Sequence, residues 1–358
     1  MDAGGAIRRR AQERGLASVL RITLSTEDTR AILDLVEGLS DRIRSVDEDS
    51  FLHEATVLAQ QLPRALRTAV NDLRLTESHG ACVISGFPLD PADVGPTPAH
   101  WQNRLGAPSS PADFYFFLVA TLLGDVVGWA TQQGGRLMHD LVPIKGHESE
   151  QLGSGSTHEL VWHTEEAFHP FRADYLALMC LRNDDAVATT YSSLDDIAPT
   201  REEWDVLSRS CFTIRPDPSH LPSSQPDRQL TDAQAELLQR SLNRIVQMQE
   251  SPVPMQILFG DPARPYLRID PAFMVPTGNP ECDEAVARIS AKIEAAMVGV
   301  ALRPGELLVI DNYRVVHGRA AFQPRYDGTD RWLKRLNIVR DLRKSREART
   351  SPAGRVIH

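Results

Sequence analysis

Cysteine and long apolar runs are both scarce in this sequence. The 358 residues include four cysteines, and no two of them form a Cys-x-x-Cys pair. Such scattered cysteines argue against a disulfide framework or a structural zinc site, and they favour a reducing compartment. No stretch of about 18 apolar residues is present, so we expect no membrane span. The cysteines are Cys82, Cys180, Cys211 and Cys282.

Positive charge is also in deficit, because 39 Lys and Arg face 48 Asp and Glu, for a formal net charge of -9. Nucleic-acid binding needs clustered Lys and Arg for phosphate contacts, so we expect no nucleic-acid partner. A small cationic ligand remains compatible with this balance. The basic start, MDAGGAIRRRAQERG, precedes no long apolar segment. We therefore expect a flexible leader over residues 1–20 rather than a secretory signal, and a cytoplasmic location.

The chain up to about residue 127 is mainly helical in pattern. Ser25 followed by acidic residues is typical of a helix N-cap, and the apolar spacing of residues 50–75 predicts helix interrupted by Pro63. The stretch over residues 112–132 is apolar nearly all round, which predicts a buried helix. GACVISGFPLD, over residues 80–90, has the pattern of a strand between glycine and proline.

From about residue 128 the pattern changes to short apolar or alternating runs separated by Gly, Pro, Asp and Asn. Many short strands spaced in this way predict an antiparallel sandwich or barrel. Two helical patterns, over residues 231–249 and 282–300, would pack outside it. The expected fold is therefore mainly β with flanking α-helices, in one domain over residues 21–341. The polar residues 342–358 are expected to form a flexible basic tail.

The stretch VWHTEEAFHPF concentrates metal-binding side chains. In a strand, His163 and Glu165 would point to one face and Glu166 to the other. A histidine and a carboxylate side by side make two thirds of the facial triad that holds Fe(II) and leaves coordination positions open. His317, in the apolar stretch LLVIDNYRVVHGRAAF, is the best third ligand. We give His169 no ligand role, because it precedes Pro170 at an expected turn.

This spacing alone leaves other interpretations open. A His-x-Glu pair is commonly a surface ion pair, and two histidines with a glutamate also suit a zinc hydrolase. However, the sequence contains no HExxH helix to supply a general base. Arg331 lies fourteen residues beyond His317, and Arg335 follows four residues later. Arginine is a bidentate partner for carboxylates, so Arg331 could hold the far carboxylate of 2-oxoglutarate and Arg335 a second carboxylate.

Taken together, these motifs resemble the clavaminate-synthase-like Fe(II)/2-oxoglutarate-dependent oxygenases. The likeness is strongest to hydroxylases of free amino acids from peptide-antibiotic pathways, such as the arginine beta-hydroxylases of the viomycin and capreomycin type. It runs from about residue 128 to about residue 341 and is weaker before that. The segments that carry it are GWATQQGGRLMHD, EQLGSGSTHELVWHTEEAFHPFRADYLALMCLRN and DNYRVVHGRAAFQPRYDGTDRWLKR.

The resemblance implies a double-stranded β-helix, or jelly-roll, core with Fe(II), 2-oxoglutarate and O2 as cofactor and co-substrates. It implies that His163, Glu165 and His317 bind iron. Arg331 would bind 2-oxoglutarate with help from a threonine, for which we choose Thr190 over Thr189.

The resemblance also implies where the amino acid substrate binds. Its carboxylate would contact Arg335. Its amino group would contact one of Gln132 and Gln133, whose alternation predicts that only one faces the site. The glycine- and serine-rich stretch over residues 145–159 is either a plain surface loop or a lid, and in a lid Leu152 and Ser154 would close over the substrate.

The specificity of the substrate side chain depends on three further residues. Asp217 and Asp270 match positions where the arginine hydroxylases have acidic residues, although each also precedes a proline and could simply cap a turn. Buried guanidinium needs carboxylate partners. Next to Asp270, however, the sequence has Arg268 where a second acid is expected. An Arg268–Asp270 pair would suit the ureido group of citrulline.

The expected activity is hydroxylation of an unactivated C–H bond, at C3 or C4, of a free basic or ureido amino acid in natural-product biosynthesis. L-arginine is the first choice, with L-citrulline, L-lysine and cyclic guanidino amino acids as alternatives. Double hydroxylation or desaturation would need only a small shift of the substrate. Other classes left open are the same chemistry on a scavenged sulfonate, a zinc hydrolase, and a jelly-roll binding protein without catalysis.

Overall fold

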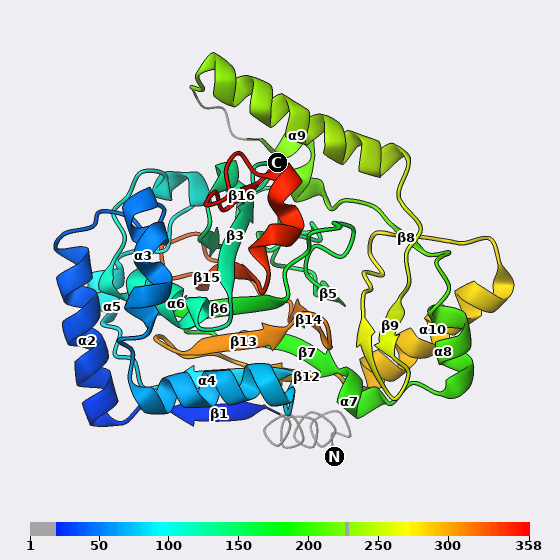
Figure 1. The fold of residues 1–358 in the computed structure, drawn as a ribbon, viewed down its shortest axis with the longest axis horizontal. Coiled ribbons are helices and arrows are strands. Elements are labelled where there is room, and N and C mark those ends of the chain that lie inside the picture. The colour runs from blue at the N-terminus through cyan, green and yellow to red at the C-terminus, as the bar shows by residue number, and fades with distance from the viewer. Residues whose placement is uncertain (1–18, 226–228) are drawn as a thin grey trace.

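The computed structural model of the chain describes residues 19–225 and 229–358 (Figure 1). The leader predicted over residues 1–20 lies outside the described residues up to residue 18. Two β-sheets form the centre of the described chain, and helices surround them. The expectation of a mainly β fold with flanking helices is therefore confirmed.

The larger sheet has eight strands in the order β1-β2-β13-β6-β15-β3-β16, with β4 paired to β15. The β1–β2 and β3–β16 pairs are parallel and the other pairs are antiparallel. The strands are β1 (Leu20–Thr23), β2 (Ala81–Ser85), β3 (Asp125–Trp129), β4 (His139–Leu141), β6 (Tyr175–Arg182), β13 (Leu307–Asp311), β15 (Trp332–Val339) and β16 (Val356–Ile357).

The smaller sheet has four antiparallel strands in the order β12-β7-β14-β5. They are β5 (Leu160–His163), β7 (Thr189–Ser193), β12 (Val298–Val300) and β14 (Val315–Arg319). Two further antiparallel pairs extend the β structure beyond it. These pairs are β9 (Leu258–Asp261) with β10 (Arg264–Leu267), and β8 (Thr213–Ile214) with β11 (Met274–Val275).

The run YLALMCL is apolar throughout because strand β6 is buried on both faces. Leu176, Leu178 and Cys180 pack toward the smaller sheet, in one core that also contains Tyr191 and Val315. The alternate residues of β6 belong to a second core, between the larger sheet and the N-terminal helices. Period-two alternation thus sends successive side chains of one strand into two different cores.

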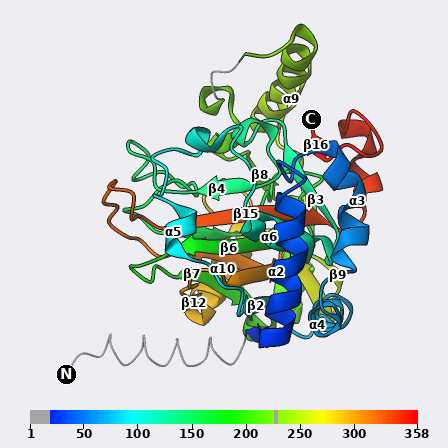
Figure 2. The same ribbon diagram turned by 90° about the vertical axis from the view of Figure 1, so that its left-hand side faces the viewer.

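Four helices from the first third of the chain cover the outer face of the larger sheet (Figure 2). Ser25 caps the first of them, as its sequence predicts. Edge-to-face contacts join Phe51 to Phe114 and Phe117, with ring centroids 5.2 Å apart in both pairs. The helices are α2 (Thr26–Ser40), α3 (Asp49–Ala59), α4 (Arg64–Thr76) and α6 (Pro111–Thr121), and the short α5 (Pro91–Val94) precedes α6.

The buried helix expected over residues 112–132 is shorter than predicted, because α6 ends at Thr121 and strand β3 follows. Gly124 explains the change. A Cβ atom at this position would lie 2.4 Å from the carbonyl oxygen of Val339, so only glycine lets the chain pass this close to β15. The long apolar stretch is therefore a helix and a strand.

In Figure 1, the remaining helices lie beside the smaller sheet, except for one at the top of the molecule. α10 and α8 pack on each other, and α9 projects at the top. These helices are α7 (Leu194–Ile197), α8 (Arg201–Leu207), α9 (Asp232–Glu250) and α10 (Pro280–Ala296). Within the described ranges, no helix has both the length and the apolar character that a membrane span requires.

Short 3-10 turns complete the structure. They are η1 (Trp101–Arg104), η2 (Gln133–Gly135), η3 (Pro218–His220), η4 (Pro222–Ser224) and η5 (Leu342–Ala348).

The prediction of a loose tail over residues 342–358 is wrong. Strand β16 pairs with β3, and Ile357 and Ala348 are buried in one cluster with Val127 and Trp129. The buried guanidinium of Arg349 also donates hydrogen bonds to backbone carbonyls within the segment. The polar composition of this segment did not indicate these few apolar contacts. They attach the C-terminus to the edge of the larger sheet.

This attachment predicts a measurable loss of stability on truncating Ile357, whose exposed fraction is 1%. Ile357→Ala should lower the free energy of unfolding by about 2–5 kcal/mol, because it removes buried methyl groups beside Trp129. Val253, which is 69% exposed, offers the matched control, and Val253→Ala should change stability by less than about 0.5 kcal/mol. Urea unfolding of the two variants checks this, and equal stabilities would contradict a docked C-terminus.

Candidate active site

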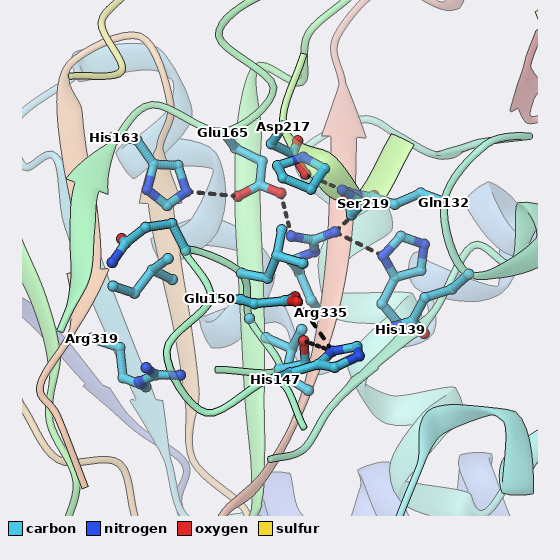
Figure 3. A pocket seen from close by; sticks show the side chains of 18 of the residues that line it. Gln132, His139, His147, Glu150, His163, Glu165, Asp217, Ser219, Arg319 and Arg335 are labelled. Carbon is cyan, nitrogen blue, oxygen red and sulfur yellow. Dashed lines mark hydrogen bonds and ion pairs between the residues drawn. The ribbon is translucent and has the colours of Figure 1, made fainter. Parts of the chain in front are cut away.

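A cavity of about 570 Å³ opens between the two sheets (Figure 3). Strands β5, β7 and β14 of the smaller sheet and β4, β6 and β15 of the larger one contribute to its wall, together with residues 144–154 and 217–225. Many charged and polar side chains are part of its lining, whereas the neighbouring space between the same sheets is filled by apolar side chains. The space between the sheets is therefore a packed core in one part and a charged cavity in the other.

His163, Glu165 and His317 meet in this cavity with their ligand atoms within 4.8 Å of one another. His163 and His317 are cross-strand partners on β5 and β14, with ring centroids 4.6 Å apart. Oε2 of Glu165 lies 3.8 Å from Nε2 of His163 and 3.3 Å from Nε2 of His317. Two imidazoles and one carboxylate thus converge as the facial triad of a non-haem metal site requires.

Asn312 positions the carboxylate of this group, and the sequence analysis missed it. Strand β5 ends at His163, so no ladder holds Glu165. Instead, the backbone N–H of Glu165 donates to Oδ1 of Asn312 over 2.7 Å, and Nδ2 of Asn312 donates to the Glu165 carbonyl over 3.0 Å. Asn312 directly follows β13, and it also donates to the carbonyl of Ala173. The DNY segment that precedes β14 was the available signal.

The hydrogen bonds of His163 and the ionised carboxylate of Glu165 suit a bound cation. Nδ1 of His163 lies 2.8 Å from the carbonyl of Val161, which leaves Nε2 for a metal. Burial acts to raise the pKa of Glu165. The charge of Arg335 and the hydrogen bonds from the two histidines outweigh it and hold that pKa well below its usual range. An ionised carboxylate and two imidazole nitrogens in a cavity with open space are a donor set suited to Fe(II).

Arg331 is a buried cation in need of a partner. Its Nη2 donates to Oγ1 of Thr189 over 3.2 Å, and its buried Nε has no hydrogen-bond partner. Within the described ranges, no carboxylate lies within ion-pair distance of it. Burial lowers the pKa of Arg331 to about 10. A buried guanidinium left in this state favours an anionic ligand, and a carboxylate is the natural one.

The choice of Thr190 over Thr189 does not fit this geometry. In β7, Thr189 lies opposite Arg319 and Tyr191 lies opposite His317. Directly paired residues share a face of the sheet, so Thr189 points into the cavity with them and Thr190 points away. The sequence revealed the alternation but gave no register against β14, which decides the face.

Arg335 lies at the centre of the polar network in Figure 3. Its guanidinium contacts Oε1 of Glu165 and donates over 2.8 Å to both Nδ1 of His139 and Oε1 of Gln132. Burial and the positive charge of Arg335 together hold the pKa of His139 well below its usual value, so His139 is a neutral acceptor. His139, on β4, is a second residue that the sequence analysis did not select.

Both glutamines line the cavity, contrary to the prediction that only one faces it, but only Gln132 has its amide in this network. The side chain of Gln133 instead donates to the carbonyl of Asp140 and accepts from its N–H. In residues 145–159, Leu152 and Ser154 both line the cavity, and Oγ of Ser154 lies 3.0 Å from Nδ1 of His147. This stretch therefore forms part of the cavity wall.

Asp217 and Asp270 both line the cavity, whereas Arg268 does not. Each aspartate also caps a turn, since Asp217 accepts from the N–H of Ser219 and Asp270 from that of Ala272. Burial raises the pKa of Asp270 to about 6, and the nearby charge of Asp217 acts in the same direction. Two carboxylates thus lie in this part of the cavity, and Asp270 is largely buried.

The expected Arg268–Asp270 pair is absent, so Arg268 as a substrate-binding residue is a wrong prediction. Its guanidinium turns away from the cavity and donates to the backbone carbonyls of Ala167 and His169. The two residues are close in sequence, but Arg268 donates to backbone carbonyls of the turn over residues 166–169 and not to the carboxylate of Asp270.

Glu166 is a further correction, because it lines the cavity instead of facing away. The backbone leaves the strand conformation after β5, and Glu166 has a left-handed φ of 52°. Its carboxylate contacts Gln132 and His220. His169 stays outside the metal-binding group, because its Nδ1 accepts from the N–H of Phe171.

Two histidines and one carboxylate at the edge of a cavity between two β-sheets define a non-haem metal enzyme. The chain belongs to the taurine catabolism dioxygenase TauD, TfdA family, whose profile matches residues 55–337. The oxygenase family expected from the sequence is thereby confirmed.

Relatives extend along nearly the whole chain. Enduracididine beta-hydroxylase of Streptomyces hygroscopicus is 46% identical over 95% of this chain and 100% of its own length. The L-ornithine/L-arginine 3-hydroxylase of Catenulispora acidiphila is 42% identical over 94% and 99%. The crystal structure of the non-heme iron oxygenase OrfP with Fe, succinate and (3S)-hydroxy-L-Arg superposes with a TM-score of 0.87 at 38% identity, covering 94% of this chain and 99% of that one.

The metal-binding group leads to a direct prediction. Anaerobic titration with Fe(II) should load one iron per chain, and His317→Ala should weaken binding by more than about 100-fold, since even outer-shell changes cost 10–100-fold. His158, which is exposed and outside the cavity lining, provides the control, and His158→Ala should bind iron normally. Unchanged iron affinity in His317→Ala would exclude this residue as a ligand.

Proposed function

We propose that the protein uses Fe(II), 2-oxoglutarate and O2 to hydroxylate C3 of a free basic amino acid, with L-arginine as the preferred substrate. One observation carries the proposal: a single cavity holds the His163–Glu165–His317 group, the unpaired cation of Arg331 and the two carboxylates of Asp217 and Asp270. The first group suits a metal, the arginine suits a dicarboxylate, and the two carboxylates suit a cationic side chain.

The overall reaction consumes one O2. One oxygen atom enters the C–H bond of the amino acid, and the other enters succinate as 2-oxoglutarate loses CO2. The iron centre with 2-oxoglutarate supplies this oxidising chemistry, and the protein supplies binding, orientation and exclusion of water. His163, Glu165 and His317 would hold the metal and leave its remaining positions free.

Arg331 would hold the distal carboxylate of 2-oxoglutarate, with Thr189 as a second donor. The guanidinium is already buried and already oriented by Thr189, so binding needs no further ordering of this side chain. A bidentate carboxylate would satisfy the Nε and Nη groups that the protein leaves open. The neighbouring guanidinium of Arg319, also buried, adds positive potential to this end of the cavity.

Arg335 and Gln132 would hold the α-carboxylate and α-amino groups of the substrate, beside the metal. The guanidinium of Arg335 lies against Glu165, so an amino acid bound there is brought close to the metal. Ser154 and Leu152 line the same cavity and would close over the substrate backbone. C3 is the carbon nearest to these anchors after the α-carbon, which supports attack at that position.

Asp217 and Asp270 would pair with the far end of the substrate. Among the described residues, neither carboxylate has a lysine or arginine partner, and such a pair suits a guanidinium, which donates from several N–H groups at once. A neutral ureido group would leave one carboxylate facing its carbonyl oxygen. Because Arg268 is held elsewhere, the oxygen of a citrulline ureido group would lack the cation that an Arg268–Asp270 pair would have offered.

A cyclic guanidino amino acid is the second candidate substrate. The identity of 46% to an enduracididine beta-hydroxylase over nearly all of this chain supports it. The cavity of about 570 Å³ offers room for a ring as well as for an extended side chain.

We further propose that the facing eight- and four-stranded sheets are the two layers of a double-stranded β-helix.

The role of Arg331 can be tested through the Michaelis constant for 2-oxoglutarate. Arg331→Met should raise it by about 100-fold, because a charge-assisted carboxylate contact is worth up to about 3 kcal/mol. Arg340→Met, at an exposed arginine, should leave it unchanged. Succinate formation at saturating arginine provides the measurement. Equal constants for the two variants would remove Arg331 from the 2-oxoglutarate site.

The substrate assignment can be tested with a panel of arginine, enduracididine, ornithine, lysine, citrulline and asparagine, followed by product mass. Arginine should gain one oxygen, citrulline should react poorly, and Asp270→Asn should raise the Michaelis constant for arginine by about 10–100-fold. Asp261→Asn is the matched control, because Asp261 caps a similar two-residue turn outside the cavity. Preferred turnover of citrulline would reject the carboxylate-pair argument.

A further inference from the structure

Two buried side chains, Glu166 and His220, support residues that line the substrate cavity. Neither belongs to the His163–Glu165–His317 group. We infer that Glu166 and His220 act as one unit that positions Gln132, and through it Arg335, for the α-amino acid group of the substrate. This inference rests on the proposed function and adds a positioning residue, His220, to it.

His220 is enclosed on every side. Its side chain has no exposed surface, and Nε2 lies 2.7 Å from Oε2 of Glu166, whose side chain is 1% exposed. Nδ1 lies 2.8 Å from Oγ1 of Thr131. The rings of Trp129 and Phe168 lie nearly perpendicular to the imidazole ring, with centroids 6.3 and 5.1 Å from it. His220 does not line the cavity, so it can act on a substrate only through the residues that it holds.

Glu166 transmits this support to Gln132. Oε1 of Glu166 accepts from Nε2 of Gln132 over 3.0 Å, while its other oxygen faces His220. Nε2 of Gln132 also donates to Oγ of Ser219 over 2.9 Å. The left-handed φ of Glu166 is a further sign of constraint, since such backbone persists in a non-glycine residue only where its surroundings hold it.

The Glu166 contact decides which way the amide of Gln132 points. A glutamine amide has a donor end and an acceptor end of nearly the same shape. With the donor end on Glu166, the acceptor Oε1 receives a hydrogen bond from Nη2 of Arg335. The reversed amide would place its NH2 against a guanidinium and its oxygen against a carboxylate. Glu166 therefore keeps an acceptor in the cavity, where an ammonium group needs one.

One short turn connects both ends of the substrate site. Turn η3 and the residue before it contribute Asp217 to the cavity, Ser219 to Gln132 and His220 to Glu166. Docking of His220 under Glu166 thus fixes the same turn that carries Asp217. The residues that support the α-amino acid end of the site and the carboxylate of Asp217 thus lie within four successive positions of the chain, residues 217–220.

A second metal site is the competing explanation, because Glu166, Asp217 and His220 also bring their ligand atoms within 4.8 Å of one another. The distances favour a direct ion pair between Glu166 and His220. Oδ2 of Asp217 is 3.8 Å from Nε2 of His220, whereas Glu166 is at hydrogen-bond distance, and Thr131 and Gln132 already engage the remaining polar atoms of the pair. The metal count of the protein distinguishes the two explanations.

The test uses His220→Leu, Glu166→Leu and the double variant, with His158→Ala as control. Leucine fills the buried space, and the double variant leaves no unpaired charge, so it should fold even if a single variant does not. Each variant, loaded with Fe(II) and 2-oxoglutarate, is titrated with arginine by calorimetry without oxygen. Oxygen is then added, and hydroxyarginine and succinate are quantified.

We expect each single variant to bind arginine at least about 10-fold more weakly, because it loses the buried ion pair and leaves the remaining partner without its counter-charge. The Michaelis constant for 2-oxoglutarate should change less than about 2-fold, and less hydroxyarginine should form per succinate. Because the pair acts as a unit, the double variant should be no weaker than the singles. His220→Gln, which retains a donor toward Glu166, should recover part of the affinity.

Three results would contradict this inference. Wild-type arginine affinity and coupling in the double variant would show that the pair positions nothing. Equal weakening of arginine and 2-oxoglutarate binding would indicate a general structural role. Two metal ions per wild-type chain and one in the double variant would identify a metal site. By contrast, a wild-type protein that forms no succinate with any amino acid of the panel would reject the proposed function, and this inference with it.

Discussion

The contact between Glu165 and Arg335 is the interaction on which the arrangement of the cavity depends. One carboxylate oxygen of Glu165 faces His163 and His317, and the other faces the guanidinium of Arg335. A single side chain is therefore common to the metal-binding group and to the proposed binding site for the amino acid. Ligands at these two places must lie side by side, as the oxidation of a specific C–H bond requires.

Charge burial explains why the surrounding network is so extensive. The guanidinium of Arg335 has three polar partners. It forms an ion pair with Glu165 and hydrogen bonds with His139 and Gln132. Arg331, by contrast, has one threonine and no carboxylate among the described residues. A buried cation without a charged partner favours the binding of an anion, as at Arg331, whereas Glu165 fixes the guanidinium of Arg335 beside the metal-binding group and leaves its Nε without a hydrogen-bond partner. This difference separates the two arginines, although both follow His317 at short intervals.

Much of the site could be predicted from sequence because its residue types are rare in apolar strands. His163 and Glu165 occur together before an apolar β segment, and His317 interrupts another. The structure brings these three together. The failures have a common origin in register and local backbone. Thr189 replaces Thr190 through its pairing with β14, and Glu166 enters the cavity through a left-handed φ.

The sequence by itself determined the mainly β fold with flanking helices, the family and the residue types of a metal site. It did so because alternation, glycine and proline punctuation and motif spacing are local properties of the chain. The tertiary structure alone decided which acceptor Arg268 finds, how His220 reaches Glu166 and why Ile357 is buried. These depend on contacts between segments far apart in sequence, whose distances and registers no local pattern encodes.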